Sequence, residues 1–274
     1  MKHKAFLFFA AFLCASSFAA SVDTVVIFSS SMRKPVKCAV VKPDCYDNNQ
    51  RHFPVVYLLH GFSDRYDTWL KKVPEIKRYA DEMQMMIVCP DGGYSSWYFD
   101  SPVDSSFRYE TLIGTEVVQY IDNHYRTLAD RGHRAITGHS MGGHGALYLV
   151  LRHPEIFGAV GSMSGGVDMR PFPGEWDIAK RIGDIKTHPG NWQNMSVTGM
   201  INKPFSTPLS IMIDCGTDDF FYQVNHQLHA KMIQLKIPHD YVERPGRHTW
   251  AYWANAIEYQ LLFFRKYFSQ IFAN

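Results

Sequence analysis

The stretch Gly138-His139-Ser140-Met141-Gly142 joins a short apolar run at 135–137 to a helical pattern that starts near residue 145. Strand, tight turn and helix in this order are typical of a nucleophile elbow, in which a serine Oγ projects above the end of a sheet. Glycine on both sides of the turn lets the strand and helix backbones approach closely. We therefore interpret Ser140 as the candidate nucleophile of an acyl-transfer site.

Short apolar runs alternate with helical patterns on both sides of this motif. The predicted strands are 24–28, 36–41, 55–59, 86–89, 134–137, 158–163, 209–213 and 240–243. The predicted helices are 75–83, 111–125, 141–152, 220–235 and 250–272. The first two strands suggest an antiparallel pair, and the later alternation predicts a mostly parallel sheet with helices on both faces. With the elbow at its centre, this order favours an α/β-hydrolase fold.

The composition is that of one globular domain. Hydrophobic residues make up 46% and charged residues 20% of the 274 residues, and the formal net charge is +2. No block of Lys or Arg stands out, so the sequence offers no footprint for nucleic acid. It carries no indication of an oligomeric state.

The first twenty residues differ from the rest. A basic start, Lys2-His3-Lys4, precedes an apolar run at 5–15 and small residues before position 21. This layout predicts a secretory signal peptide at 1–20, with export to the periplasm or the exterior. The alternative is a membrane anchor, but the run is shorter than the roughly 20 apolar residues that span a bilayer. A single catalytic domain is then expected over 21–274.

Four cysteines follow the predicted signal peptide. Cys89 and Cys215 each end an apolar run, which favours buried free thiols. Cys38 and Cys45 are close in sequence, and in an exported chain the sequence leaves undecided whether they form a disulfide. No CxxC pair occurs, so zinc and redox chemistry are not indicated.

A serine nucleophile needs a base and a group that orients the base. His248 lies in a turn-rich loop between the last predicted strand and the last helix, and it is the candidate base. The acid is expected after the strand at 209–213, where Asp219 is preferred by its place in the loop and Asp218 is the alternative. For either aspartate, a helix N-cap is the structural alternative.

Two backbone N–H groups are expected to form an oxyanion hole. The first belongs to Met141, the residue after the nucleophile, and the second to Phe62, where Gly61 allows the chain to turn toward the site. No metal site is expected, because His226 and His229 have no further ligands nearby and are read as a solvated helix face.

Two long irregular segments interrupt the alternation, at 91–108 and about 165–208. Both are rich in aromatic residues, and long loops in compact domains are often lids or binding loops. The predicted substrate-binding residues are Tyr94, Trp97, Trp176 and Trp250. The alternative is that these rings only pack against their own segments.

Four motifs in this order resemble one known family. They are Leu59-His-Gly-Phe, Gly138-His-Ser-Met-Gly-Gly, Asp214-Cys-Gly-Thr-Asp-Asp and the loop around His248. The chain is similar in them to the esterase D-related α/β-hydrolases, which include S-formylglutathione hydrolases, feruloyl and acetylxylan esterases, and mycolyltransferases. The resemblance extends over about 51–268. It implies the same acid, base and oxyanion donors as the residue-based argument.

The resulting expectation is an exported serine carboxylesterase that needs no cofactor. Its substrate would be a feruloyl or acetyl ester, on plant polysaccharide or a related small molecule. An acyltransferase to a sugar hydroxyl would carry the same residues, and a thioesterase of the S-formylglutathione hydrolase type is a further alternative. A binding protein on an inactive scaffold is disfavoured by the intact Ser140, Asp219 and His248. No stable membrane insertion is expected.

Overall fold

The computed structural model describes residues 20–272. The signal peptide predicted at 1–20 therefore lies, except for its last residue, outside the described residues. Within 20–272, every helix is too short or too polar to cross a lipid bilayer.

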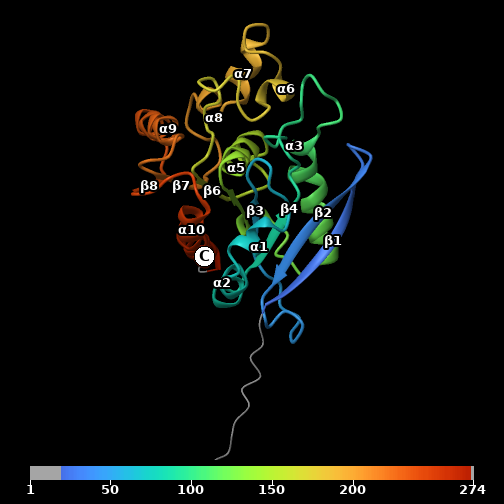
Figure 1. Cartoon of the computed structure of the whole chain (residues 1–274). Coiled ribbons are helices and arrows are strands. Elements are labelled where there is room, and N and C mark those ends of the chain that lie inside the picture. Colours follow the sequence, from blue (N-terminus) through green and yellow to red (C-terminus); the bar gives the residue numbers. More distant parts are fainter. Residues whose placement is uncertain (1–19, 273–274) are drawn as a thin grey trace, which may run out of the picture.

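One eight-stranded sheet forms the centre of the molecule (Figure 1). Its strands lie in the order β1-β2-β4-β3-β5-β6-β7-β8, and β2 is antiparallel to β1 and β4 while the others run parallel. The strands are β1 Ser21–Ser29, β2 Lys34–Lys42, β3 Val55–Leu59, β4 Met86–Pro90, β5 Arg134–Gly138, β6 Ala159–Met163, β7 Ser210–Gly216 and β8 Asp240–Arg244. All eight predicted strands are present, and the predicted antiparallel start is confirmed.

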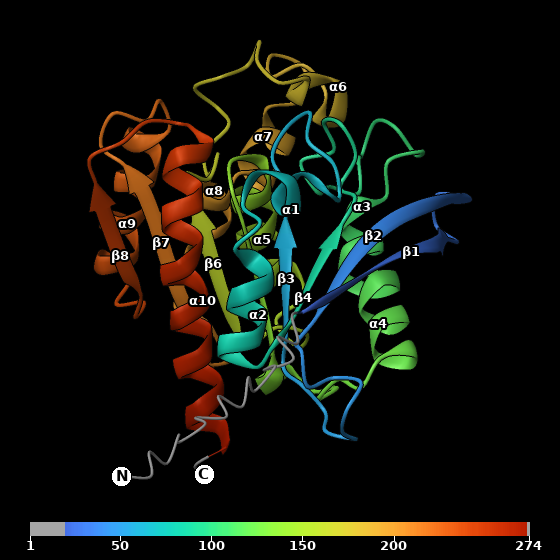
Figure 2. The ribbon, with the colours of Figure 1, turned by 60° about the horizontal axis from the view of Figure 1, so that its bottom comes forward.

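Helices cover both faces of the sheet (Figure 2). One face is covered by α1 Thr68–Lys72, α2 Ile76–Met83 and α10 Trp250–Phe272. The other is covered by α3 Tyr109–Thr111, the π-helical turn Leu112–Val117, α4 Val118–His124, α5 Met141–Arg152 and α9 Tyr222–Gln234. A one-turn 3₁₀ helix, Arg131–His133, precedes β5. The predicted α/β-hydrolase architecture is confirmed.

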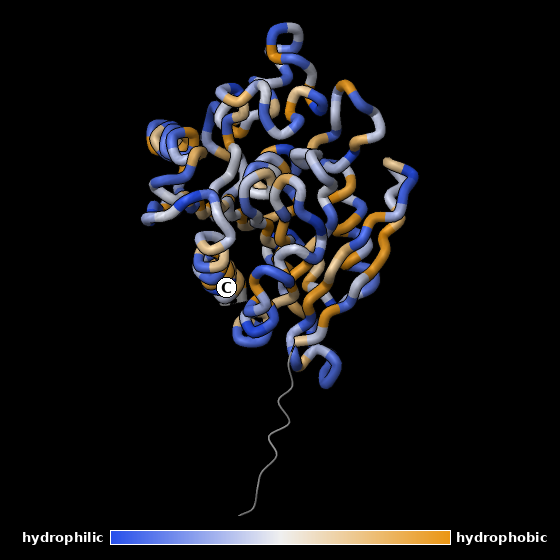
Figure 3. Tube along the Cα trace, viewed as in Figure 1, coloured by the Kyte–Doolittle hydropathy of each residue, from blue (hydrophilic) through white to orange (hydrophobic). Residues whose placement is uncertain are grey.

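The central strands β3, β4, β5 and β6 are buried along their whole length. Continuous apolar runs are what a strand needs when helices cover both of its faces. Figure 3 shows the same division, with apolar colour along the inner strands and hydrophilic colour on peripheral turns. Because the parallel strands point the same way, the loops that follow β3, β5 and β7 meet at one edge of the sheet.

The long segment at 165–208 contains three short helices that the sequence did not predict. They are α6 Ile178–Ile182, α7 Pro189–Met195 and α8 Val197–Met200. Figures 1 and 2 show this segment at the end of the molecule toward which the parallel strands point.

The four described cysteines all carry free thiols. Cys89 and Cys215 are buried, as predicted. Cys38 is also buried, whereas the Cys45 thiol donates a hydrogen bond to the side chain of Gln84. The disulfide that the sequence left undecided between Cys38 and Cys45 is therefore not formed in this structure.

Candidate active site

The turn around Ser140 has the geometry of an elbow. Ser140 has φ 56° and ψ −119°, a backbone conformation that L-residues rarely adopt. A Cβ on Gly142 would lie 2.6 Å from the carbonyl oxygen of Leu59, and one on Gly138 would lie 2.7 Å from the same oxygen. Any side chain at either position would clash with the backbone. Glycine at both positions therefore allows the strand, the turn and α5 to pack this closely.

The side chains of Ser140, His248 and Asp219 form one hydrogen-bonded series. The His248 Nε2 to Ser140 Oγ distance is 2.8 Å. The His248 Nδ1 atom lies 3.0 Å from Asp219 Oδ1 and 2.9 Å from Oδ2. An ionised carboxylate only accepts, so Nδ1 carries the proton and donates it to Asp219. Nε2 is then the acceptor for the Ser140 hydroxyl.

Of the two candidate aspartates, the structure places Asp219 at the imidazole. The Asp219 side chain is fully buried, and Oδ1 also accepts the N–H of Phe221 at 2.8 Å. Asp218 is exposed, and its backbone N–H donates to Gly246 in the loop that carries His248. Asp219 thus orients the ring, while Asp218 links the two loops through its backbone.

Three aromatic rings surround the His248 imidazole. The ring centroids of Phe220, Phe221 and Trp253 lie 4.1 Å, 5.4 Å and 4.8 Å from the imidazole centroid, and the Trp253 ring is nearly perpendicular to the imidazole. Sequence reasoning missed all three residues. Two of them directly follow Asp219, and Trp253 lies one turn after Trp250 on α10, so their positions beside predicted site residues were the available signal.

The two predicted oxyanion donors lie next to the nucleophile. Among residues 20–272, neither the Phe62 N–H nor the Met141 N–H has an acceptor. Met141 is the first residue of α5, so its N–H lies at the positive end of the helix dipole. Phe62 lies in the loop after β3, and Gly61 and Phe62 both line the pocket that contains Ser140.

That pocket has a volume of about 290 Å³. Of the predicted binding residues, Trp176 and Trp250 line it. Trp176 stacks on Phe220 with a centroid distance of 5.5 Å and an interplanar angle of 19°. Trp176 therefore brings the 165–208 segment into contact with the ring that covers His248.

The other two predicted binding residues lie outside the lining of this pocket. Trp97 is only 1% exposed, and its indole N–H donates to the carbonyl of Trp176. Tyr94 is 60% exposed, and its ring packs against Phe62. Trp97 supports a pocket wall from behind, and Tyr94 lies outside the pocket against the loop after β3. Most of the aromatic segment 91–108 is packing, since Tyr98 and Phe99 are also fully buried.

His139, the residue before the nucleophile, forms a second polar pair in the pocket. Its Nε2 lies 3.1 Å from Oδ2 of Asp64. Burial lowers the pKa of His139 to about 4 although the neighbouring Asp64 carboxylate opposes this change. His139 is therefore neutral near pH 7. Burial also lowers the pKa of His60, whose Nε2 accepts the N–H of Gly92.

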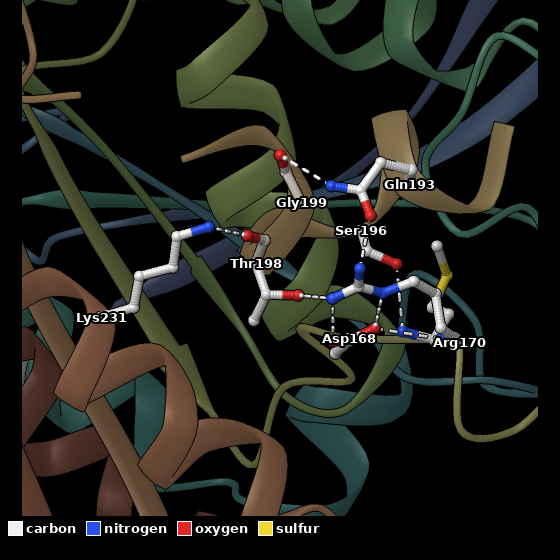
Figure 4. A network of polar contacts seen from close by, with 8 residues as sticks. Asp168, Arg170, Gln193, Ser196, Thr198, Gly199 and Lys231 are labelled. Carbon is white, nitrogen blue, oxygen red and sulfur yellow. Dashed lines mark hydrogen bonds and ion pairs between the residues drawn. The ribbon is translucent and has the colours of Figure 1, made fainter. Parts of the chain in front are cut away.

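A polar network cross-links the 165–208 segment (Figure 4). Arg170 donates to both carboxylate oxygens of the buried Asp168, at 2.8 Å and 2.5 Å, and to the side chains of Gln193 and Thr198. Lys231 on α9 donates to the carbonyl of Thr198 at 2.6 Å. The network thus links distant parts of the segment to one another, and Lys231 joins the segment to α9.

Within residues 20–272, no three metal-ligating side chains come together. His226 Nδ1 lies 3.0 Å from Glu243 Oε1, and His229 Nδ1 lies 2.8 Å from His239 Nε2.

Known proteins resemble the chain over most of its length. The family model described as "Putative esterase" matches residues 29–264. An acetyl esterase of Caldicellulosiruptor saccharolyticus is 27% identical over 230 residues, which cover 78% of this chain and 85% of that protein. A solved ferulic acid esterase superposes with a TM-score of 0.78 and 29% identity, covering 92% of this chain and 99% of that one.

A third relative matches over a shorter segment. An esterase of Mycobacterium tuberculosis is 34% identical over 134 residues, which cover 48% of this chain. The same segment covers 29% of that esterase, so the chain spans a minor part of this relative's length.

Proposed function

The chain belongs to the esterase family of carboxylic ester hydrolases, and from that premise we propose that it is an exported serine carboxylesterase acting on feruloyl or acetyl esters of carbohydrates. The observation that carries the proposal is the hydrogen-bonded series from Ser140 through His248 to Asp219. The family resemblance inferred from the sequence is confirmed.

In the proposed reaction, the Ser140 oxygen attacks the ester carbonyl while His248 Nε2 takes its proton. The 2.8 Å contact between these atoms is within direct proton-transfer distance. Asp219 holds the Nδ1 proton and stabilises the imidazolium that forms. His248 then protonates the departing alcohol, and an acyl-enzyme remains on Ser140.

The tetrahedral intermediate carries a negative charge on the former carbonyl oxygen. We assign its stabilisation to the N–H groups of Phe62 and Met141, because both lack acceptors among residues 20–272. Donors of this kind contribute on the order of 10²–10³ in rate each. A water activated by His248 hydrolyses the acyl-enzyme by the reverse path, releasing the acid.

The aromatic pocket supports an acyl group with an apolar or aromatic body. Trp176, Phe220 and Trp250 supply its flat apolar walls. Two of the similar proteins are named acetyl esterase and ferulic acid esterase, and they motivate the two acyl groups proposed here. Export is supported by the basic and apolar start of the sequence.

The test compares the purified protein with its Ser140→Ala variant on methyl ferulate, acetylated xylan and nitrophenyl acetate. We expect the variant to lose roughly 10⁴-fold or more in kcat on every substrate that the unmodified protein hydrolyses. Equal turnover by the variant would refute the serine mechanism. Turnover of nitrophenyl acetate alone would refute the carbohydrate substrates.

Product analysis in the presence of a sugar acceptor separates hydrolysis from acyl transfer. Free acid as the sole product supports hydrolysis, whereas an acylated sugar identifies a transferase. S-formylglutathione added to the same panel tests the thioesterase alternative.

A further inference from the structure

A basic hollow lies where β2 runs past the end of β4. The last residue pair between these strands is Cys38 with Pro90, so Lys34–Lys37 have no strand beside them on that side. Asp91, Tyr109 and the loop residues Arg65 and Tyr66 close the space instead. We call this space the β2 hollow, and it has a volume of about 370 Å³.

Three cations and one carboxylate line the β2 hollow. Neither Lys34 nor Lys37 forms an ion pair in the described part of the chain, and Arg65 reaches Asp67 only at 4.0 Å. The Asp91 carboxylate accepts the backbone N–H groups of Gly93 at 2.9 Å and Tyr66 at 3.4 Å. The charge of Asp91 is thus partly stabilised locally, and the hollow keeps an excess of positive charge.

Two tyrosine rings accompany the lysines. The Lys34 ammonium lies 4.9 Å from the ring centroid of Tyr109 and donates to the hydroxyl of that residue at 3.0 Å. The Lys37 ammonium lies 5.8 Å from the ring centroid of Tyr66. A cation beside an aromatic ring suits a ligand that combines a negative group with an apolar face.

The β2 hollow opens on the same edge of the sheet as the Ser140 pocket. One loop separates them, because Gly61–Asp64 line the Ser140 pocket and the next two residues, Arg65 and Tyr66, line the hollow. β2 and β5 are three strand positions apart, which corresponds to about 14 Å. An oligomeric substrate can bridge that distance, and a small ester cannot.

We propose that the β2 hollow is a subsite for a carboxylate-bearing sugar, a uronate unit, of a polymeric ester whose acyl group reacts at Ser140. The inference rests on the proposed function and adds a preference for acidic over neutral polysaccharide. The carboxylate pairs with Lys37, while Lys34 and Arg65 add to the positive charge around it, and the sugar ring packs on the half-buried ring of Tyr66. A small ester bound at Ser140 does not reach the β2 hollow.

The experiment measures binding without turnover. Ser140→Ala protein is titrated calorimetrically with a xylotetraose that carries one glucuronate branch and with unbranched xylotetraose. We expect tighter binding of the acidic ligand, weakened by added salt because partly exposed ion pairs are screened. In the same background, Lys34→Gln/Lys37→Gln is expected to weaken binding of the acidic ligand about tenfold and of the neutral ligand less than about twofold.

Two further variants control for folding and for total charge. Lys37→Gln/Arg65→Gln keeps the Lys34 contact with Tyr109, and it is expected to weaken binding of the acidic ligand as well. Lys77→Gln/Lys266→Gln removes the same charge from the exposed faces of α2 and α10 and is expected to leave binding unchanged. Equal affinity for both ligands, or an equal loss in the control, overturns the proposal.

Failure of the subsite and failure of the proposed function give different results. With Ser140 intact, all three lysine and arginine variants are expected to hydrolyse nitrophenyl acetate at the unmodified rate. Absence of that activity in the unmodified protein refutes the esterase mechanism. Intact activity with no preference for the acidic ligand refutes only the uronate subsite.

Discussion

The hydroxyl of Tyr252 donates a hydrogen bond to the buried carboxylate of Asp214, which joins the first turn of α10 to the end of β7. Arg244, at the end of β8, donates to the other carboxylate oxygen. His248 lies in the loop between Arg244 and Tyr252, so both ends of its loop are fixed to one side chain. Burial raises the pKa of Asp214, and the contacts with Tyr252 and Arg244 act in the opposite direction.

Tyr252→Phe removes one of these two attachments while keeping the ring. We expect kcat to fall about tenfold with KM changed less than about twofold, because His248 is positioned less firmly while the substrate pocket is unchanged. The Asp214 carboxylate loses a buried partner, so the free energy of unfolding should fall by about 1–3 kcal/mol.

Tyr259→Phe is the matched control for this change. Tyr259 lies on the same helix, is 49% exposed, and contacts Arg244 only through its ring. Steady-state kinetics and urea unfolding of both variants measure the difference. An unchanged kcat in Tyr252→Phe would show that the hydrogen bond between Tyr252 and Asp214 does not act on the position of His248.

The strands and the elbow were predictable because each follows a local rule. An apolar run of about five residues specifies a covered strand, and the two glycines around Ser140 are required by contacts within the turn. Helix α1 and the helices α6, α7 and α8 were not predicted. They are four to seven residues long, which is too short for a helical period to show.

The aromatic residues show where sequence reasoning stops. Trp97 and Trp176 have the same chemistry and both lie in irregular segments, yet Trp97 is buried behind the pocket while Trp176 lines it. The difference depends on tertiary packing, which no spacing rule encodes. The β2 hollow was missed for the same reason, since its lysines and Arg65 come together only where β2 extends past the end of β4.

A buried acid makes the stability of the chain depend on pH. Burial opposes ionisation of Glu110, but hydrogen bonds with His153, Tyr148 and Arg152 outweigh it and lower the pKa of this carboxyl to about 2. Its unfolded value is 4.5, so the stabilisation is complete above pH 4.5 and is lost as the pH falls toward 2. The difference corresponds to roughly 3 kcal/mol.

Glu110→Gln should therefore lower the free energy of unfolding by roughly 2–3 kcal/mol at pH 6 and by about 1 kcal/mol at pH 3. The same contact raises the pKa of His153. The stability that His153 contributes is therefore present at low pH and is lost as the pH rises through the folded-state pKa of His153. Urea titrations at the two pH values measure the effect. Glu155→Gln, a 68% exposed side chain beside His153, should change little, and an equal effect of both variants would contradict the assignment.

Arg170 should control how firmly the 165–208 segment is held. Arg170→Leu leaves Asp168, whose side chain is 8% exposed, without its ion-pair partner (Figure 4). We expect faster proteolytic cleavage within 165–208 and a higher KM, because Trp176 in this segment lines the Ser140 pocket. The double variant Asp168→Asn/Arg170→Leu also removes the unpaired buried carboxylate, and it should recover part of the lost resistance to cleavage.

The pair of the exposed Lys180 and the partly exposed Asp177 in the same segment provides the comparison. Lys180 is 68% exposed and lies 2.8 Å from Asp177, so Lys180→Met should change neither cleavage nor KM. Limited proteolysis followed by mass spectrometry locates the cuts. Cleavage outside 165–208 in Arg170→Leu would mean that the network stabilises the whole domain and not this segment.

Asp219 fixes the tautomer of His248, and Asp219→Asn tests this separately from the shape of the site. The asparagine amide can present an N–H to Nδ1, which favours the tautomer with its proton on Nε2. Nε2 then faces the Ser140 hydroxyl as a donor and cannot take its proton. We expect kcat to fall by on the order of 10⁴ with KM nearly unchanged. Asp218→Asn, the exposed neighbour, should keep kcat within about twofold, and similar losses in both variants would assign the effect to the loop and not to the tautomer.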